Sequence, residues 1–288
     1  MTSFKNFKVQ TPLVLQKPFH EHMKFFIKDA AAYFGVNING WHDFRRYYYN
    51  PWLVNDHLKV ERLSEKEIEY VMEVSVQTLI EYKERLSKYS DEELKLTSQG
   101  SILPLLDELM RTDPVHRRII DIGSCYSRVF REISLKYPDF VWDMVDFPSN
   151  LEEINEDIRT PGMQFHTAYP LDFVEATDQR YDAVIFNRTL AWMGVEQIGA
   201  YLNALRDKAR YIVFAEPCKI LFEPGSLNID AIRMNRPRAY NGNFLVHNYR
   251  AVFENFGYEL IHYDADSSTQ INTTPMHFML RGVARPKA

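Results

Sequence analysis

Short apolar runs alternate with segments of helical spacing through the C-terminal two thirds of the chain. One such run, Ile119 to Ile122, is rich in β-branched residues, follows two arginines and stops at Gly123, which indicates a buried strand. Beyond it, Val129 and Ile133 recur at helical spacing and predict a helix. The other runs that we interpret as strands span residues 140–145, 163–168, 181–186, 210–215, 258–263 and 277–283. The segments that we interpret as helices lie at 102–110, 128–136, 148–158, 195–208 and 249–256.

This alternation predicts an α/β fold built on a seven-stranded sheet. Strands that are separated by helices form mostly parallel sheets with right-handed crossovers. The last two strands are the exception, because the loop between them carries no helical pattern.

The link between the first strand and its helix consists of small residues. Gly123, Ser124, Cys125 and Ser127 occupy it. A strand that runs through such a turn into a helix is the first unit of a Rossmann-like sheet, in which the backbone closely approaches a ligand. The second strand ends in Asp146, and an acidic residue at this tip is placed to accept hydrogen bonds from ribose hydroxyls.

The first hundred residues have a different pattern. Residues 20–34 and 64–87 are spaced like amphipathic helices, and the second of these opens with a capping-box sequence. Ser90 and Glu93 repeat that spacing and predict a shorter helix. These segments predict a helical N-terminal region that is distinct from the sheet.

Aromatic residues gather between residues 41 and 52 of this region. One interpretation is packing against the main domain. The other is a lid over a substrate pocket, in which the rings and the neighbouring arginines would contact a ligand. We therefore divide the chain into a helical cap or lid, residues 1–98, and a Rossmann-like domain, residues 99–288. A homodimer interface on the cap is a further alternative.

Composition limits the partners. The net charge of -5 provides no basic footprint for nucleic acid. The sequence has no apolar run of membrane-spanning length and no apolar signal-peptide core at its start. Cys125 and Cys218 lie far apart and form no disulfide framework. We expect a cytoplasmic protein without a nucleic-acid or membrane partner.

The pattern Asp121-x-Gly123-x-Cys125-x-Ser127 resembles motif I of the class I S-adenosylmethionine (SAM) dependent methyltransferases, and Asp146 matches their ribose-binding acid. The resemblance covers residues 100–288, where the final strand pair without a helix is also typical of this family. It implies SAM as the cofactor. The family usually has glycine where this chain has Cys125 and Ser127, and both residues are small.

The resemblance assigns roles to residues at the carboxyl ends of the strands. It places Asp121 toward the amino acid portion of SAM and Phe147 against adenine, and it places Asn187 beside the methionine portion. Tyr169 or Asp172 would contact the adenine amine. The full set expected to bind the cofactor is Asp121, Gly123, Ser124, Cys125, Asp146, Phe147, Tyr169 and Asn187.

A hydroxyl acceptor of the methyl group benefits from a general base. Glu216, His166 and His247 are the candidates, and we favour His247 because it precedes the helix before the sixth strand. Arg188 and Trp192 follow the fourth strand, on the side where the family binds substrate.

Three arginines, Arg233, Arg236 and Arg238, lie in one loop between the fifth strand and the last helix. They form either a solvated loop or a binding site for an anionic acceptor, since guanidinium groups bind carboxylate and phosphate bidentately. No His and carboxylate residues stand at metal-ligand spacing, so we expect no metal.

The leading hypothesis is SAM-dependent methyl transfer to a hydroxyl of a sugar or anionic metabolite, since the chain loosely resembles bacterial sugar and small-molecule O-methyltransferases. The alternative is a non-catalytic methyltransferase-like protein that has lost its cofactor and acts as a partner or scaffold. A nicotinamide-dependent oxidoreductase fits poorly, because the turn lacks Gly-x-Gly-x-x-Gly and no Ser/Tyr-x-x-x-Lys pair follows the fourth or fifth strand.

Overall fold

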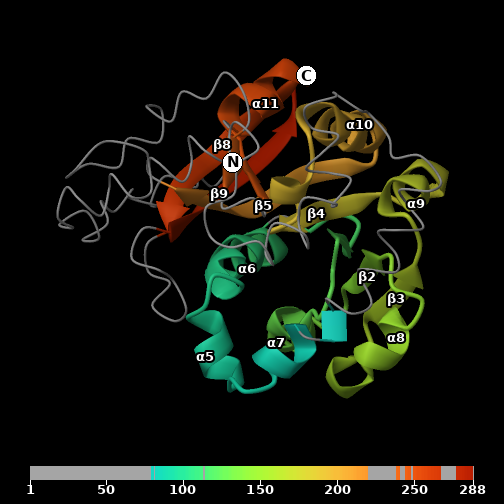
Figure 1. The fold of residues 1–288 in the computed structure, drawn as a ribbon. Coiled ribbons are helices and arrows are strands. Elements are labelled where there is room, and N and C mark those ends of the chain that lie inside the picture. Colours follow the sequence, from blue (N-terminus) through green and yellow to red (C-terminus); the bar gives the residue numbers. More distant parts are fainter. Residues whose placement is uncertain are drawn as a thin grey trace, which may run out of the picture.

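A seven-stranded sheet in the order β3-β2-β1-β4-β5-β9-β8 runs through the molecule (Figure 1). The computed structural model describes residues 79–80, 82–112, 114–219, 238–240, 244–247, 249–266 and 277–287. The strands of the sheet are β1 (Arg118–Ile122), β2 (Val141–Asp146), β3 (Met163–Thr167), β4 (Tyr181–Asn187), β5 (Ala209–Lys219), β8 (Tyr258–Asp266) and β9 (His277–Pro286).

The sheet is mostly parallel. Strands β3, β2, β1, β4 and β5 pair in parallel, whereas β9 pairs antiparallel with β5 and with β8. The predicted α/β fold with a seven-stranded, mostly parallel sheet is therefore confirmed among the described residues. The connection between the last two strands, residues 267–276, lies outside them.

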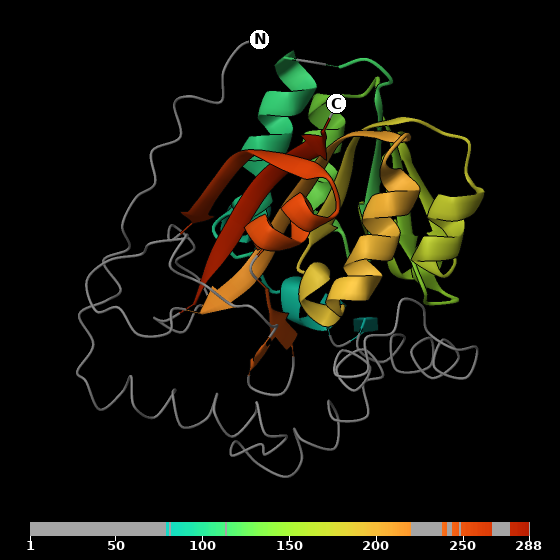
Figure 2. The same cartoon turned by 90° about the horizontal axis from the view of Figure 1, so that it is seen from above.

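Helices cover both faces of the sheet. Figures 1 and 2 show α10 and α11 on one side and α6 and α7 on the other. Alternate residues of β1 reach the two cores: Ile119 packs with the α6 and α7 side chains, and Ile120 packs with those of α9, α10 and α11. This alternation follows from the two-residue period of a strand. The longer helices are α6 (Leu103–Thr112), α7 (Arg131–Lys136), α9 (Pro170–Ala176), α10 (Val195–Leu205) and α11 (Tyr249–Asn255), and short helical turns lie at η2 (Gly100–Ile102), η3 (Arg128–Phe130) and η5 (Leu190–Trp192).

Four elements differ from the sequence interpretation. The helix expected at 128–136 consists of η3 followed by α7, and the helix expected at 148–158 is split into α8 (Leu151–Ile154) and η4 (Glu156–Ile158). The segment after β3 was expected to be a loop, but it contains α9. Pro170 is compatible with the first turn of this helix, because backbone N–H groups there have no hydrogen-bond partner within the helix. A separate hairpin of β6 (Arg238–Tyr240) and β7 (Phe244–Val246) was not predicted.

The described part of the N-terminal region packs beside the sheet domain. Helix α5 (Asp91–Lys95) begins with the predicted capping box, in which Glu93 N–H donates to Ser90 Oγ and Ser90 N–H donates to the Glu93 carboxylate. Leu79, Leu86 and Leu94 form a third core cluster with residues that follow β1 and β2. The expected helix at 20–34 and the aromatic patch at 41–52 lie outside the described residues, and the cap remains a prediction.

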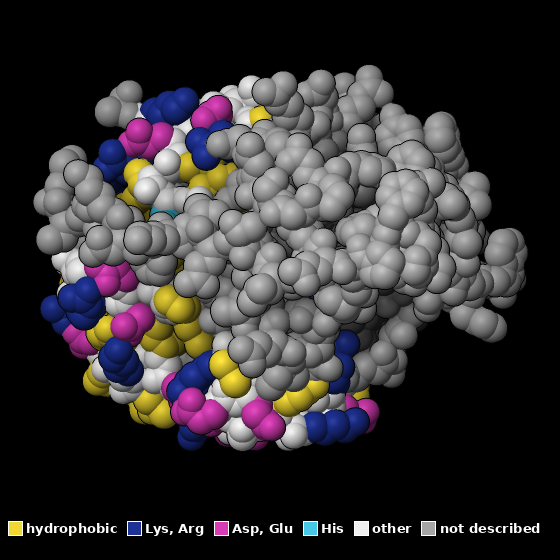
Figure 3. Space-filling model, turned by 90° about the vertical axis from the view of Figure 1, so that its left-hand side faces the viewer, with side chains coloured by type: hydrophobic (Ala, Val, Ile, Leu, Met, Phe, Trp, Pro, Cys, Tyr) yellow, Lys and Arg dark blue, Asp and Glu magenta, His cyan; other side chains and the backbone are white. Residues whose placement is uncertain are grey.

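Charges of both signs are interspersed on the molecular face in Figure 3, over the residues that the structure describes there. None of the helices in the described ranges has the length and apolar character needed to cross a bilayer. Within those same ranges, no group of His, Cys, Asp and Glu side chains could hold a metal ion.

Candidate functional site at the switch point of the sheet

β1 and β4 are neighbours, but the chain proceeds from them toward opposite edges of the sheet. Their carboxyl ends therefore form a topological switch point, where open α/β sheets bind ligands. Two segments border this point: the β1 turn, residues 123–127, and the β4 loop, residues 188–193. The hydroxyl of Thr189 donates to the carbonyl oxygen of Ile122 at 3.0 Å and joins the two segments.

The β1 turn contains two residues in the left-handed region of backbone conformation, Gly123 with φ 73° and Cys125 with φ 52°. A Cβ added at Gly123 would lie 2.7 Å from Cγ2 of Thr189, so both the backbone and the packing require glycine. Cys125 adopts a conformation that is uncommon outside glycine.

Asp146, at the end of β2, is joined to the turn through its carboxylate. Oδ2 accepts from Cys125 N–H at 2.7 Å, and Oδ1 accepts from Phe147 N–H at 2.8 Å. Burial raises the pKa of Asp146 to about 6, and the two amide hydrogen bonds act in the opposite direction. The predicted ribose acid thus lies directly against the predicted cofactor turn.

Asp121 and Ser127 lie under the turn. The Ser127 hydroxyl donates to the Ser124 carbonyl oxygen at 2.6 Å and lies 3.4 Å from Asp121 Oδ2. Burial, together with the nearby charge of Asp146, raises the pKa of Asp121 well above its ordinary value. The Ser124 hydroxyl is buried and has no hydrogen-bond partner among the described residues.

Arg188 begins the β4 loop in a left-handed conformation with φ 64°. Its amide donates to the Ala215 carbonyl oxygen, and its guanidinium interacts electrostatically with Cys125. It also interacts with the hydroxyl of Tyr82: burial raises the pKa of this tyrosine, and Arg188 opposes the rise. Sequence analysis did not single out Tyr82, because nothing in its helical pattern signals a contact with a loop about a hundred residues away.

Glu216, expected as an alternative base, supports the β4 loop. Oε1 accepts from Thr189 and Leu190 N–H at 3.0 and 2.8 Å, and Oε2 accepts from Ala191 N–H at 3.1 Å. The carboxyl therefore satisfies amides at the start of η5 that have no intrahelical partner. Burial raises the pKa of Glu216 to about 8, and the amides oppose this shift.

His247 lies at the other end of the β4 loop and is buried. Its Nε2 lies 2.9 Å from the Met193 carbonyl oxygen, so this nitrogen carries the proton and donates. Nδ1 is then an acceptor, and it has no partner among the described residues. Burial lowers the pKa of His247 to about 4.

The residues expected around adenine are in contact with each other. The Phe147 and Tyr169 rings are tilted by 30° with their centroids 5.5 Å apart, and both belong to the core on the α10 side of the sheet. Asp172 is exposed in the first turn of α9. Asn187 Nδ2 donates to the Gln99 carbonyl oxygen at 3.2 Å, while Asn187 Oδ1 is buried without a partner in the described structure.

The remaining candidates are more distant or lie outside the description. His166 Nε2 lies 2.8 Å from Asp143 Oδ1, and Arg118 contacts the same carboxylate at 2.6 and 2.9 Å. Trp192 is half-buried in η5. The structure describes neither Arg233 nor Arg236, and for Arg238 it describes only the backbone, in β6.

The switch point, where open α/β sheets have their ligand crevice, is rich in buried carboxyl groups. Asp121, Asp146 and Glu216 all have raised pKa values, with burial as the largest cause. A bound cation would favour the charged form of each. In the described part of the chain, the arrangement suits a ligand with a positive centre and hydroxyl donors.

Three solved structures show what the fold is similar to. Human N-acetylserotonin methyltransferase in complex with SAM has a TM-score of 0.53 at 12% identity, over 86% of this chain and 68% of the human chain. LepI in complex with SAM has a TM-score of 0.46 at 15% identity, over 63% of this chain and 46% of LepI. A SAM-dependent methyltransferase from Methanosarcina mazei has a TM-score of 0.44 at 12% identity, over 64% and 98% of the two chains. No family model and no curated protein matches the sequence.

The likeness to the human enzyme establishes the fold. The chain has the Rossmann-like fold of the class I SAM-dependent methyltransferases, as the resemblance of residues 121–127 to motif I led us to expect.

Proposed function

We propose that the crevice at the switch point binds SAM and that the protein transfers its methyl group to a hydroxyl of a small anionic acceptor. The observation that carries this proposal is the contact between Asp146 and the β1 turn, in a fold of this class. An acidic side chain beside a strand-turn-helix backbone matches the chemistry of an adenosyl group, whose ribose hydroxyls donate to carboxylates.

The residues that are present fit this cofactor. The buried oxygens of Ser124 and Asn187 lack partners among the described residues, and such atoms favour a bound polar ligand. The cationic sulfonium of SAM suits a crevice with the carboxyls of Asp121 and Asp146. Phe147 and Tyr169 supply an apolar surface for adenine. When bound, SAM supplies an electrophilic methyl group.

The acceptor side is formed by the β4 loop. Arg188 supplies the cation that an anionic acceptor needs, and it lies between Tyr82 and the β1 turn. In-line transfer requires an acceptor oxygen that is held in the direction of the methyl group. Trp192 and the three arginines of residues 233–238 stay candidates for the same task.

We assign the general base to His247. Because Nε2 donates to Met193, the lone pair lies on Nδ1, which is buried without a partner among the described residues and would take the proton of an acceptor hydroxyl that reaches it. With a pKa of about 4, the ring is neutral throughout the physiological range. Glu216 is the weaker candidate, because three amides already occupy its oxygens.

A non-catalytic role is the second candidate, and one observation favours it. Both oxygens of Asp146 already accept backbone hydrogen bonds, one of them from Cys125, where the family usually has glycine. A turn that these hydrogen bonds hold in place would keep the shape of a cofactor site without binding a cofactor. Transfer of a labelled methyl group distinguishes the two candidates.

The test is to incubate the protein with methyl-labelled SAM and a panel of phosphorylated sugars, sugar nucleotides and hydroxy acids. We expect label in at least one acceptor. His247→Gln should lower turnover by about a hundredfold, as loss of a general base does. Arg188→Gln should chiefly raise the KM, because ground-state binding of the anion is lost. Full turnover by His247→Gln at every pH would remove His247 from this role.

A further inference from the structure

We propose that residues 82–95, which lie outside the sheet, act through their contacts with Tyr126 and Arg128 as a clamp that positions the β1 turn, so that these contacts and the occupancy of the site are thermodynamically coupled. The proposal deepens the proposed function, since it names residues that regulate the same site. We call residues 82–95 the clamp segment.

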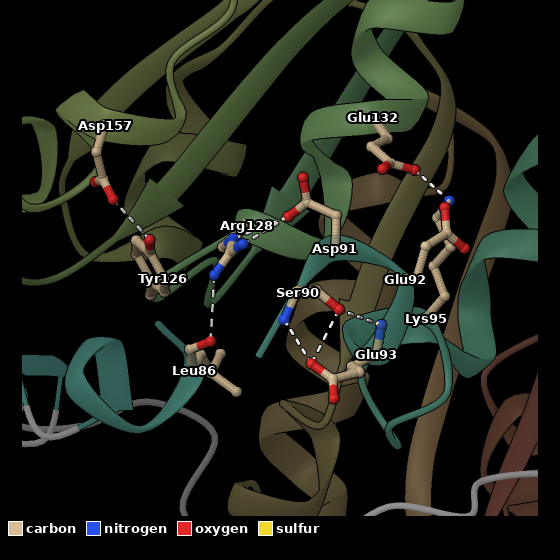
Figure 4. A network of polar contacts seen from close by, with 10 residues as sticks. All are labelled: Leu86, Ser90, Asp91, Glu92, Glu93, Lys95, Tyr126, Arg128, Glu132 and Asp157. Atoms are coloured by element: carbon tan, nitrogen blue, oxygen red, sulfur yellow. Dashed lines mark hydrogen bonds and ion pairs between the residues drawn. The ribbon is translucent and has the colours of Figure 1, made fainter. Parts of the chain in front are cut away.

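The first connection is made by Arg128, which directly follows the β1 turn. Its Nε donates to Asp91 Oδ1 at 2.9 Å, and its Nη1 donates to the Leu86 carbonyl oxygen at 3.3 Å (Figure 4). One guanidinium thus holds both the start of α5 and the end of the preceding helical turn. Arginine suits this position because its fork of donors can bind two acceptors at once.

The second connection is made by Tyr126, in the middle of the turn. Its hydroxyl donates to Asp157 Oδ2 at 2.8 Å (Figure 4), and the other oxygen of Asp157 accepts from Lys83 Nζ at 2.7 Å. The Lys83 ammonium also lies 5.2 Å from the centre of the Tyr126 ring. The clamp segment therefore holds the tyrosine from its face and, through Asp157, from its hydroxyl.

Apolar packing closes the clamp. Leu79, Leu86 and Leu94 form one buried cluster with Tyr126, and the half-buried Cys125 packs against this cluster. The amide of Cys125 is the donor that holds Asp146. A continuous set of contacts therefore runs from the clamp segment through Tyr126 and Cys125 to the proposed ribose acid.

The polar contacts of the clamp segment are expected to position the β1 turn and to contribute little to the free energy of unfolding of the whole protein. The Lys83 and Asp157 side chains are 31% and 50% exposed, and ion pairs this exposed contribute little to folding. Their geometry nevertheless restrains a turn that contains a non-glycine residue in a left-handed conformation. Loss of the clamp should therefore release the turn while the sheet stays folded.

The chain offers a matched control. Lys95 forms ion pairs with Glu132 of α7 and with Glu92, and thus joins the same segment to the sheet domain without touching the β1 turn (Figure 4). Glu132→Gln removes a contact of similar exposure and leaves Tyr126 and Arg128 in place. It should affect neither the turn nor the ligand.

The experiment measures alkylation of Cys125 by iodoacetamide, resolved by peptide mass spectrometry, in the full-length protein and the variants Tyr126→Phe and Asp91→Ala. Burial raises the pKa of the Cys125 thiol and slows its reaction in the closed turn. We expect each variant to react about threefold to tenfold faster, the range that loss of one hydrogen bond permits. Glu132→Gln should react like the wild type, and circular dichroism should show all variants folded.

Calorimetric titration of SAM then separates this proposal from the proposed function. Coupling requires that SAM slow the alkylation of Cys125 in proportion to the occupancy of the site, and that its Kd rise in both clamp variants as the fraction of closed turn falls. Unchanged alkylation in both variants overturns the clamp, even if SAM binds. Faster alkylation in a protein that does not bind SAM retains the clamp and overturns the cofactor assignment. Equal effects in Glu132→Gln would mean that the substitutions act by lowering the overall stability of the protein, and this result would also overturn the clamp.

Discussion

Asp146 connects β2 to the β1 turn through Oδ2, which accepts from Cys125 N–H, while Oδ1 accepts from the amide of the adjacent Phe147. Its pKa, raised to about 6 by burial, makes the charge of this residue sensitive to mild acid. Ribose hydroxyls and amide N–H groups both prefer the carboxylate as acceptor, because a protonated carboxyl is a weaker one. Binding and turn geometry therefore depend on the same titration.

We predict that the affinity for SAM falls as the pH is lowered from 7 to 5. Binding favours the charged form of Asp146, so below a pKa of about 6 each complex must first release a proton. Asp146→Asn should bind more weakly at pH 7 and should lose most of this pH dependence. Calorimetry at several pH values measures both, and parallel profiles for the two proteins would contradict the assignment.

Gly123 is the other residue that the turn requires. Gly123→Ala should lower the free energy of unfolding by about 1–3 kcal/mol. The cost of placing alanine in a left-handed conformation adds to the cost of the steric contact between its Cβ and Thr189 Cγ2. Gly257→Ala is the control, because Gly257 has φ 75° but its added Cβ would meet only the flexible end of Arg206. Denaturant unfolding should show the larger loss at Gly123, and Thr189→Ser should restore part of it.

Sequence patterns predicted that Gly123 follows β1 and that Asp146 ends β2, because a strand, a glycine and an acid at the tip of the next strand are all local signals. Their roles toward a cofactor stay predictions. Tyr82 and Glu216 show where such reasoning ends. The contact of Tyr82 with Arg188 and the amides bound by Glu216 depend on tertiary packing that no local pattern encodes. Whether His247 is the base stays a prediction.

At the scale of elements, the β4 loop is held from both ends. Glu216 binds the amides at its start, and His247 contacts the Met193 carbonyl oxygen at its end. The loop thus has a defined conformation although η5 is a single helical turn. The fixed loop keeps Arg188 beside the β1 turn.

Glu216 gives this arrangement a testable pH dependence. Its folded pKa of about 8 exceeds the ordinary 4.5, so the stabilisation is complete below pH 4.5 and is lost as the pH rises through 8. Glu216→Gln cannot titrate, and the difference in unfolding free energy between wild type and variant should decrease steadily across this window. A constant difference would show that Glu216 is charged throughout.

The elements themselves were largely predictable, because strongly apolar strands alternate with amphipathic helices. The sequence interpretation missed α9 because this helix begins with Pro170, and the proline was interpreted as part of a loop. It missed the β6-β7 hairpin because strands of three residues carry too few positions for a period to appear. Short elements depend on their neighbours more than on their own residues.

At the scale of the whole molecule, the order of the sheet places the carboxyl ends of β1, β2 and β4 at one edge, where the site forms. The clamp segment lies outside the sheet and contacts Tyr126 of the β1 turn through Lys83, and Arg128, which follows the turn, through Asp91. The division at residues 98 and 99 remains a prediction, but contacts across it reach the β1 turn itself. The described residues on both sides of the predicted boundary therefore contribute to the candidate site.

The central claim is that the crevice binds SAM through Asp146, and calorimetric titration of the full-length protein with SAM tests it most directly. The account predicts saturable binding at one site, no binding of NAD, and a Kd that rises by about tenfold or more in Asp146→Ala, since charge-assisted hydrogen bonds contribute about 1.5–3 kcal/mol. Absence of SAM binding at millimolar concentration, or equal affinity in wild type and Asp146→Ala, would contradict it.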